Sequence, residues 1–139
     1  MLRRVLIAMM FVFAAGPAFA EDISVIVDIS TQTMSVSVDG ITEYNWKVST
    51  GRKGHRTPTG DYRPTRMAEV YYSKKYDNAP MPHAIFFTGG FAIHGTEYIR
   101  SLGGPASHGC VRLHPDNAAL LYSLVARYGA GNTEIRIQG

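Results

Sequence analysis

The sequence predicts a mainly β protein, a single-domain β-sandwich or partly closed barrel with one principal α-helix near the C-terminus. Most segments after residue 22 alternate apolar and polar residues with the two-residue period of half-buried strands. Only one segment, 115–128, has the period of an amphipathic helix. A chain of 139 residues is long enough for one ordinary domain and too short for two, so strands and helix should share one core.

The first twenty residues have the three parts of an export signal. Arg3 and Arg4 precede an apolar run at 5–15, and Ala18-Phe19-Ala20 forms a small-residue cleavage site. The run is short for a membrane span, and acidic residues follow it at once, which favours a signal over a buried first helix. We therefore expect removal of residues 1–20, a domain at 21–139, and no membrane span after cleavage.

Export predicts a periplasmic protein, with an exoplasmic location in a Gram-positive cell as the alternative. Removal of the signal takes away two arginines and no acid, which lowers the formal net charge from +3 to +1. The remaining basic residues form only small groups, whereas a nucleic-acid binder would keep a clustered basic face. Nucleic acid is therefore not expected as a partner.

Three strands are expected in the first third of the domain, at 23–29, 34–38 and 41–49. Between the last two, Asp39-Gly40 tolerates positive φ and predicts a tight hairpin turn. Residues 50–60 are rich in Gly, Thr, Pro and basic side chains, which indicates a loop. The first third of the domain is thus interpreted as a meander that ends in a loop.

Four further strands and the helix complete the predicted domain. The strands are expected at 61–72, 84–88, 91–94 and 134–137. In the helix at 115–128, Pro115 suits the first turn and Asp116 complements the positive end of the helix dipole. Gly129 and Gly131 follow the last apolar residue and predict the end of the helix.

The stretches 93–96 and 102–113 together hold two histidines, four glycines, an arginine and the chain's one cysteine, Cys110. A lone cysteine cannot form a disulfide within the chain, although export would send it to an oxidising compartment. It is either a small buried hydrophobe or a nucleophile, which attacks as thiolate and needs a nearby base. His94, at the end of a predicted strand, is the candidate base.

The neighbours of Cys110 suggest further roles. If the segment is extended, His108 shares a face with the thiol; if it turns tightly, the backbone of His108 matters more. Gly109 lets backbone N–H groups approach a carbonyl oxygen on which negative charge develops, as in an oxyanion hole. Arg112 could hold a substrate carboxylate, or it could be a solvated or structural arginine.

At this point the residues resemble a known family. The block Ser107-His108-Gly109-Cys110-Val111-Arg112, preceded by His94-Gly95, is similar to the catalytic block of the L,D-transpeptidases, the YkuD-type domain. Three earlier blocks are also typical of that family: Ser49-Thr50-Gly51, Thr57-Pro58-Thr59-Gly60 and Pro80-Met81-Pro82. The resemblance covers nearly all of the mature chain.

The resemblance implies a cysteine acyltransferase that acts on peptidoglycan. Cys110 would attack a stem tetrapeptide after its third residue, release the terminal D-alanine and form a thioester. His94 would activate the thiol, and the carbonyl of Gly95 would orient His94, although glycine makes the chain more flexible there. An amine from a neighbouring stem would then take the acyl group and give a 3-3 crosslink.

The same resemblance implies the residues around the reaction. The N–H groups of Gly109 and Cys110 would form the oxyanion hole, Ser107 and His108 would shape it, and Arg112 would contact substrate. Residues 71–90 are aromatic-rich and are interpreted as a lid or tunnel wall that excludes water, with ordinary packing as the alternative. Within this segment, contacts with substrate are expected for Tyr72, Met81 and Phe87.

Several alternatives stay open for the site as a whole. No cofactor and no metal are expected, although a zinc site could be built from His94, His108, Cys110 and His114. The expected partners are peptidoglycan stem peptides, possible envelope-protein amines as acyl acceptors, and carbapenem-type β-lactams as covalent inhibitors. The rival functions are an L,D-carboxypeptidase, D-amino-acid exchange at the same site, and a non-catalytic peptidoglycan-binding module.

Overall fold

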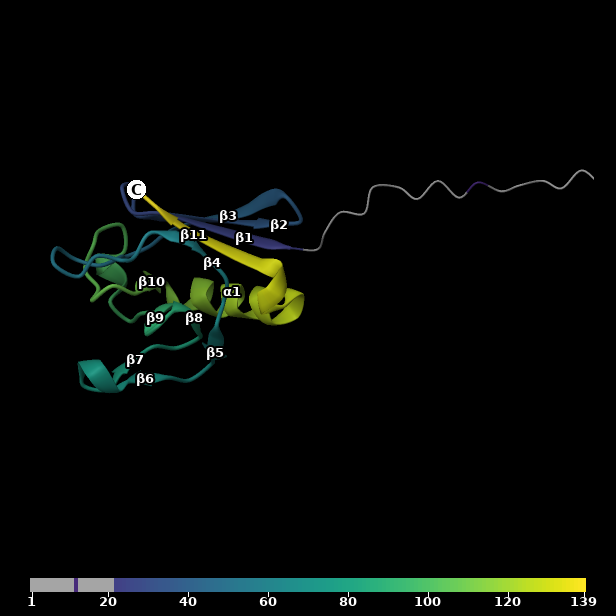
Figure 1. Ribbon diagram of the computed structural model, residues 1–139. Helices are drawn as coiled ribbons and strands as arrows, with labels where there is room; N and C mark the ends of the chain where they lie inside the picture. Colours follow the sequence, from purple (N-terminus) through teal and green to yellow (C-terminus); the bar gives the residue numbers. More distant parts are fainter. Residues whose placement is uncertain (1–11, 13–21) are drawn as a thin grey trace, which may run out of the picture.

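Two open β-sheets and one long helix make up the computed structural model, which describes Val12 and residues 22–139 (Figure 1). The first sheet has the order β3(Ile41–Lys47), β2(Thr33–Val38), β1(Ile23–Asp28), β11(Thr133–Gln138), β4(Gly60–Tyr62). The second has the order β10(Val111–Leu113), β9(Phe91–Gly95), β8(Ala84–Thr88), β5(Arg66–Ala68). A small hairpin pairs β6(Tyr72–Ser73) with β7(Ala79–Pro80). The predicted export signal lies outside the described residues, apart from Val12.

The five-stranded sheet begins with the predicted meander. Asp39 and Gly40 have φ values of 51° and 80°, which confirms a turn that needs positive φ at two consecutive positions. The first strand, β1, pairs antiparallel with β2 on one side and parallel with β11, the last strand, on the other. The parallel pairing was not predicted, because the sequence of a strand does not state its partner.

The four-stranded sheet positions the chemical centre. Its strands β8 and β9 are joined by a short turn and pair antiparallel, whereas β10 pairs parallel with β9. In this register His94 on β9 lies opposite Arg112 on β10. The pairing therefore brings together two candidate residues that are far apart along the chain.

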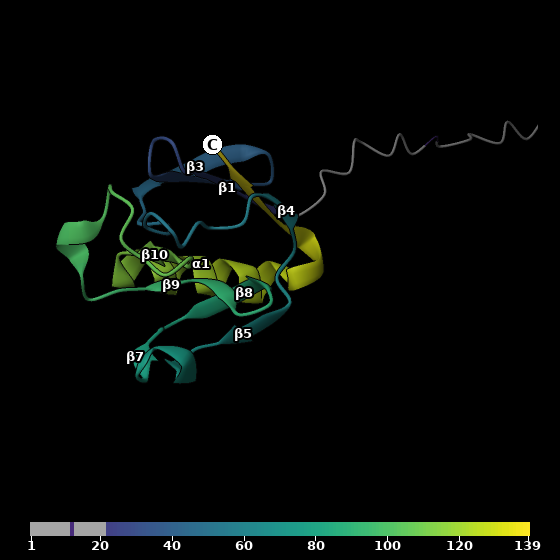
Figure 2. The same ribbon diagram turned by 60° about the vertical axis from the view of Figure 1, so that its left-hand side comes forward.

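The helix α1(Pro115–Tyr128) has the bounds that its sequence predicted. The Nδ1 atom of His114 accepts a hydrogen bond of 3.1 Å from the N–H of Asp116 and caps the first turn. Gly129, with φ of 96°, ends the helix. The helix packs against β8 and β9 and also contacts β1 (Figure 2), so it joins the two sheets.

The main core lies between the sheets and the helix. Sixteen buried residues form it: Ile23, Val25, Val27, Met34, Val36, Val48, Ile85, Phe87, Ile93, Val111, Leu113, Ala118, Leu121, Val125, Ile135, Ile137. A second, smaller core contains Met81, Ala84, Phe86 and Ala92, and Cys110 packs against it. The candidate nucleophile therefore packs against a cluster of buried side chains.

The structure selects one of the two predicted architectures and divides one predicted strand. The sheets do not close on themselves, so the architecture is the open, sandwich-like alternative. The single strand expected at 61–72 is divided among β4, β5 and the start of β6. Pro64 lies in the break between β4 and β5, and proline has no N–H to donate to a ladder.

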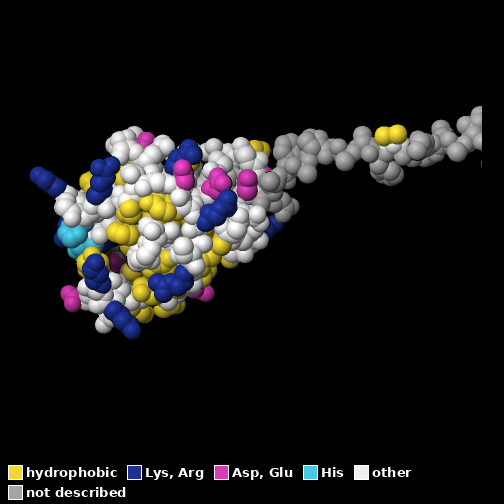
Figure 3. All heavy atoms as spheres, in the orientation of Figure 1, with side chains coloured by type: hydrophobic (Ala, Val, Ile, Leu, Met, Phe, Trp, Pro, Cys, Tyr) yellow, Lys and Arg dark blue, Asp and Glu magenta, His cyan; other side chains and the backbone are white. Residues whose placement is uncertain are grey.

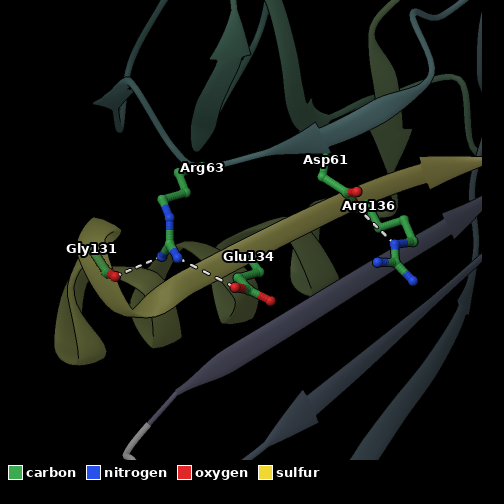
Figure 4. A network of polar contacts seen from close by, with 5 residues as sticks. All are labelled: Asp61, Arg63, Gly131, Glu134 and Arg136. Atoms are coloured by element: carbon green, nitrogen blue, oxygen red, sulfur yellow. Dashed lines mark hydrogen bonds and ion pairs between the residues drawn. The ribbon is translucent and has the colours of Figure 1, made fainter.

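The outer face of the five-stranded sheet carries paired charges (Figure 4). Arg136 Nε lies 2.7 Å from an Asp61 carboxylate oxygen, and Arg63 lies 3.3 Å from Glu134 and donates to the Gly131 carbonyl at 2.7 Å. These side chains are more than half exposed, so each pair stabilises the fold by under about 1 kcal/mol. No helix in the described part of the chain is both long enough and apolar enough to span a bilayer.

Candidate active site

His94 is the penultimate residue of strand β9 and is 5% exposed. Its Nδ1 atom lies 2.7 Å from the carbonyl oxygen of Gly95. A carbonyl can only accept, so Nδ1 carries the proton and Nε2 keeps a lone pair. The imidazole is thus held in the tautomer that a general base needs.

Gly95, expected to add flexibility, is held tightly. Its N–H donates to the carbonyl of Pro82 at 2.9 Å. A Cβ atom at this position would lie 3.2 Å from Pro82 Cγ, 3.3 Å from Pro115 Cα and 3.4 Å from Ala118 Cβ. The space of a side chain is therefore already filled by neighbours, and the carbonyl that orients His94 is fixed by packing.

Burial favours the neutral forms of both reacting groups. It lowers the pKa of His94 to about 4, although the bond to Gly95 acts in the opposite direction. Burial also raises the pKa of the Cys110 thiol, and a backbone hydrogen bond from Ala92 and the charge of Arg112 offset this only in part. At neutral pH the site therefore holds a thiol and an uncharged imidazole.

The segment 107–110 is a tight turn, so the extended alternative for His108 does not hold. Ser107 Oγ donates to the carbonyl of Cys110 at 2.6 Å and accepts from the N–H of Gly109 at 3.0 Å. Gly109 has φ of 123°, and a Cβ there would lie 2.4 Å from Phe91 Cε1. Only glycine fits this position.

The hydrogen bond of Gly109 corrects one expectation. Its N–H was assigned to an oxyanion hole together with that of Cys110. In the structure this N–H is already bonded to Ser107 Oγ, so Gly109 shapes the turn and is not a free donor. The N–H of Cys110 keeps the predicted role as a proposal.

The 50–60 loop holds the catalytic turn in place. Thr57 Oγ1 donates to the Gly109 carbonyl at 2.8 Å and accepts from the N–H of Gly51 at 2.9 Å. The N–H of Arg52 donates to the Ser107 carbonyl at 2.9 Å. The sequence alone indicates no role for Thr57. The residue belongs to a block that is typical of the family, but only the structure shows that its side chain is 1% exposed and bonded to the turn.

A cavity of about 380 Å³ opens beside Cys110. Six residues predicted for the site line it: His94, Ser107, His108, Cys110, Arg112 and Met81. The guanidinium of Arg112 lies 5.9 Å from the ring centroid of Tyr98, which also lines the cavity. The structure thus brings a thiol, a base and a cation into one space.

Two other predicted substrate contacts lie outside this cavity. Phe87 is 2% exposed in the main core, where its ring centroid lies 5.1 Å from that of Tyr62. Tyr72 is 56% exposed on β6. In the segment 71–90, which was expected to form a lid, the part from Ser73 to Met81 borders the cavity. Strand β8, in the same segment, is a core strand, which is the alternative of ordinary packing.

A second cavity, of about 370 Å³, also reaches Cys110. It is lined by Gly54, His55, Arg56, Lys75, Tyr76, Gly90, Phe91, His108 and Cys110. In Figure 3 histidine side chains gather at the left-hand end of the molecule, beside lysine and arginine side chains. His55 therefore belongs to the surroundings of the thiol.

A third cavity, of about 510 Å³, lies elsewhere, against β1, β4 and β11. Its charged residues are the exposed pairs of Figure 4, and it contains neither cysteine nor histidine. Among the residues that the structure describes, no three His, Cys, Asp or Glu side chains converge as metal ligands would. The chemical centre is therefore the pair of cavities at Cys110.

Known proteins share this sequence and fold. The family model of the L,D-transpeptidase catalytic domain, YkuD, matches residues 22–137. YqjB of Bacillus subtilis strain 168, which carries the name of an L,D-transpeptidase, is 34% identical over 114 residues, 73% of this chain and 65% of that protein. An L,D-transpeptidase from Mycobacterium smegmatis has a TM-score of 0.76 and 26% identity over 85% of this chain and 59% of its own.

A further solved structure is similar in fold. L,D-transpeptidase 3 from Mycobacterium tuberculosis, in complex with a faropenem-derived adduct, has a TM-score of 0.74 and 23% identity, over 84% of this chain and 60% of its own. The chain thus spans less than two thirds of the length of each of these relatives. The family model matches nearly all of the described residues, and we conclude that the chain belongs to the L,D-transpeptidase catalytic-domain (YkuD) family.

Proposed function

We propose that this chain is a peptidoglycan L,D-transpeptidase with Cys110 as its nucleophile. The observation that carries the proposal is the fixed tautomer of His94, which lines the same cavity as Cys110. A neutral imidazole with a free Nε2 can take the proton of an uncharged thiol as the thiol attacks. The pair therefore needs no preformed thiolate.

In the first half-reaction the Cys110 sulfur bonds to the carbonyl carbon of the third stem residue. His94 takes the thiol proton and passes it to the amine of the departing D-alanine when the peptide bond breaks. The N–H of Cys110 stabilises the oxyanion, and Arg112 holds a carboxylate of the stem. The product is a thioester on Cys110 and free D-alanine.

In the second half-reaction an uncharged amine attacks the thioester. His94 accepts a proton from this amine and returns it to the sulfur as the carbon–sulfur bond breaks. A stem amine gives a 3-3 crosslink, and an amine of an envelope protein would attach that protein to the wall. Water at the same step would make the enzyme a carboxypeptidase, and a D-amino acid would give exchange.

Two further proposals follow from membership of the family. We expect carbapenem-type β-lactams to acylate Cys110, because a strained lactam carbonyl is a substitute for the stem carbonyl and a relative carries a faropenem-derived adduct. We also propose that residues 1–20 direct export and that the domain acts in the periplasm at the cell wall. The sequence pattern at Arg3, Arg4 and Ala18-Phe19-Ala20 supports export.

The test is to incubate tetrapeptide muropeptides with the wild type, Cys110→Ala, His94→Asn and His83→Asn, and to identify products by mass spectrometry. We expect crosslinked or tripeptide products from the wild type and none from Cys110→Ala. His94→Asn should lose about 100-fold or more in rate, since general-base catalysis contributes that much.

His83→Asn is the matched control. His83 lies outside both cavities at Cys110 and has φ of 52°, a conformation that asparagine tolerates. Its activity should equal that of the wild type. Turnover by Cys110→Ala would refute the mechanism, and a wild type that binds stems without turnover would support the binding module.

A further inference from the structure

The two cavities at Cys110 share a boundary made of two rings. Tyr76, His108 and Cys110 line both cavities. His94 and Arg112 line only the first, and the second has His55 and Lys75 among its own residues. A group attached to the sulfur is therefore accessible from two sides, and the rings of Tyr76 and His108 lie where the sides meet.

These two rings are stacked. Their centroids lie 4.2 Å apart with an interplanar angle of 12°. The ring of His55 contacts His108 edge-on, at 5.1 Å and 87°, and Lys75 Nζ lies 5.5 Å from the Tyr76 centroid. Tyr76, His108 and His55 come from the β6–β7 hairpin, the catalytic turn and the 50–60 loop. The stack thus joins the hairpin to the turn that carries the nucleophile.

The hairpin is fixed at its base. The N–H of Met81 donates to the Tyr71 carbonyl, and that of His83 to the Glu69 carbonyl, each at 2.8 Å. The Tyr71 ring packs edge-on against Phe86 at 5.0 Å, on the smaller core. The base is therefore anchored by both backbone bonds and packing.

The tip is held more weakly. Strands β6 and β7 are two residues long, and between them lie the 3-10 turn η1(Lys74–Tyr76) and the left-handed residues Asp77 and Asn78. The side chain of Ser73, which precedes the turn, makes no capping hydrogen bond. The tip can therefore move about its base, and the Tyr76–His108 stack opposes that motion.

On the basis of the proposed function, we propose that the Tyr76–His108 stack keeps the two cavities separate during the life of the thioester and thereby limits its hydrolysis. In hydrolysis, water adds to the thioester carbonyl, the carbon–sulfur bond breaks, and the sulfur regains a proton through His94. The tripeptide leaves as a carboxylic acid. Tyr76 is then a positioning residue that sets the ratio of transfer to hydrolysis.

The physical reason is a difference in size between the two acceptors. A stem amine must be bound and oriented before it can attack, whereas water needs only a path to the carbonyl. When the stack opens, the two cavities merge into one larger space, and more water can lie beside the thioester carbonyl. The open state therefore favours hydrolysis more than transfer.

The experiment measures this ratio in the full domain. Tetrapeptide muropeptides are incubated with the wild type, Tyr76→Ala, Tyr76→Phe and Lys74→Ala, and tripeptide and crosslinked products are quantified. Acylation by a carbapenem, followed by intact mass, measures formation of the thioester-type bond separately. Tyr76→Phe keeps the ring, and Lys74 lies on the same turn but lines neither cavity.

We expect Tyr76→Ala to raise the ratio of tripeptide to crosslink by about 2- to 12-fold, the effect of losing one aromatic stack. Tyr76→Phe and Lys74→Ala should keep the wild-type ratio, and all variants should be acylated. A loss of folding would lower acylation and turnover together without changing the ratio.

Three results would overturn the inference. One is an unchanged ratio in Tyr76→Ala, whether its acylation is normal or slow. Another is an equal shift in Tyr76→Phe, which would assign the effect to the hydroxyl. The third is an equal shift in Lys74→Ala, which would assign it to the hairpin in general. Absence of products and of a carbapenem adduct in the wild type would instead refute the proposed function.

Discussion

At the scale of single residues, burial sets the chemistry of the site. When an exposed cysteine lies beside a histidine, the thiol tends to give its proton to the imidazole near neutral pH, which leaves a thiolate. Here burial raises the pKa of Cys110 and lowers that of His94 to about 4, so the resting pair is uncharged. A thiol in this form is less open to oxidation than a thiolate.

The shifted pKa of His94 predicts a pH-dependent stability. Its pKa is 6.5 when unperturbed and about 4 in the fold, so between these values the unfolded state binds more protons. Stability should therefore be full above pH 6.5 and fall by about 3 kcal/mol as pH drops toward 4. Urea denaturation of the wild type and of His94→Gln at both ends of this range measures the difference.

His94→Gln serves as the reference because glutamine does not titrate. Other groups titrate in both proteins, and their effects cancel in the comparison. The free energy of unfolding of the wild type should fall more steeply with acid than that of the variant. Parallel pH dependences would show that His94 does not carry this linkage.

At the scale of elements, two loops determine the position of the nucleophile. The catalytic turn is bonded internally through Ser107 Oγ, and Thr57 of the 50–60 loop bonds to the Gly109 carbonyl and to the Gly51 N–H. The Cβ of any side chain at Gly51 would lie 1.7 Å from the His55 carbonyl oxygen. The 50–60 loop is therefore folded tightly on itself, and its bond from Thr57 Oγ1 to the Gly109 carbonyl holds the catalytic turn against it.

Replacing Thr57 by valine tests this link. The variant keeps the shape of the side chain but leaves the Gly51 N–H and Gly109 carbonyl without their partner, which should cost about 1–3 kcal/mol of stability. Displacement of the turn should also slow acylation of Cys110 by a carbapenem about 10- to 100-fold. Urea denaturation and time-resolved intact mass measure the two effects.

Thr59→Val is the matched control, because Thr59 is exposed in the same block. It should leave both stability and acylation close to those of the wild type. If Thr57→Val acylates as fast as Thr59→Val, the hydrogen bonds of Thr57 do not position the nucleophile.

The sequence predicted the elements whose signals are local. The helix Pro115–Tyr128 has its period, its first-turn proline and its terminal glycine within one segment, and the Asp39-Gly40 turn needs only two residues. Strand β10 was missed because three residues are too few to show a period. The stack of Tyr76 on His108 joins separate loops, and no pattern along the chain indicates such a contact.

The substrate-contact prediction for Phe87 shows a different limit. Strand β8 is buried on both faces, with Phe86 in the smaller core and Phe87 in the main one. A strand of this kind has no alternation, so the sequence cannot say which aromatic ring points toward the thiol. By contrast, Met81 follows from the Pro80-Met81-Pro82 block and does line the cavity.

At the scale of the whole molecule, the inner and outer faces of the five-stranded sheet contribute unequally. Ile135 on β11 is 1% exposed in the main core, and its neighbour Arg136 makes an exposed ion pair with Asp61. Ile135→Ala should lower the free energy of unfolding by about 2–5 kcal/mol, and Arg136→Ala by less than about 1 kcal/mol.

Thermal and urea denaturation of the two variants, measured side by side, test this prediction. They change adjacent residues of one strand, so a difference between them reports the face and not the position along the chain. Equal losses of stability would indicate that the fold depends on the outer-face charges as much as on the core.

The parallel pairing of β1 with β11 also governs the order of assembly. Strand β1, the first of the domain, pairs with β11, which is the last strand described. The hydrogen bonds between them therefore join residues that are about 110 positions apart in the sequence. Such a contact has the highest sequence separation available and forms late. A nascent chain therefore cannot complete this sheet until β11 has been synthesised, and until then β1 lacks one of its two neighbours.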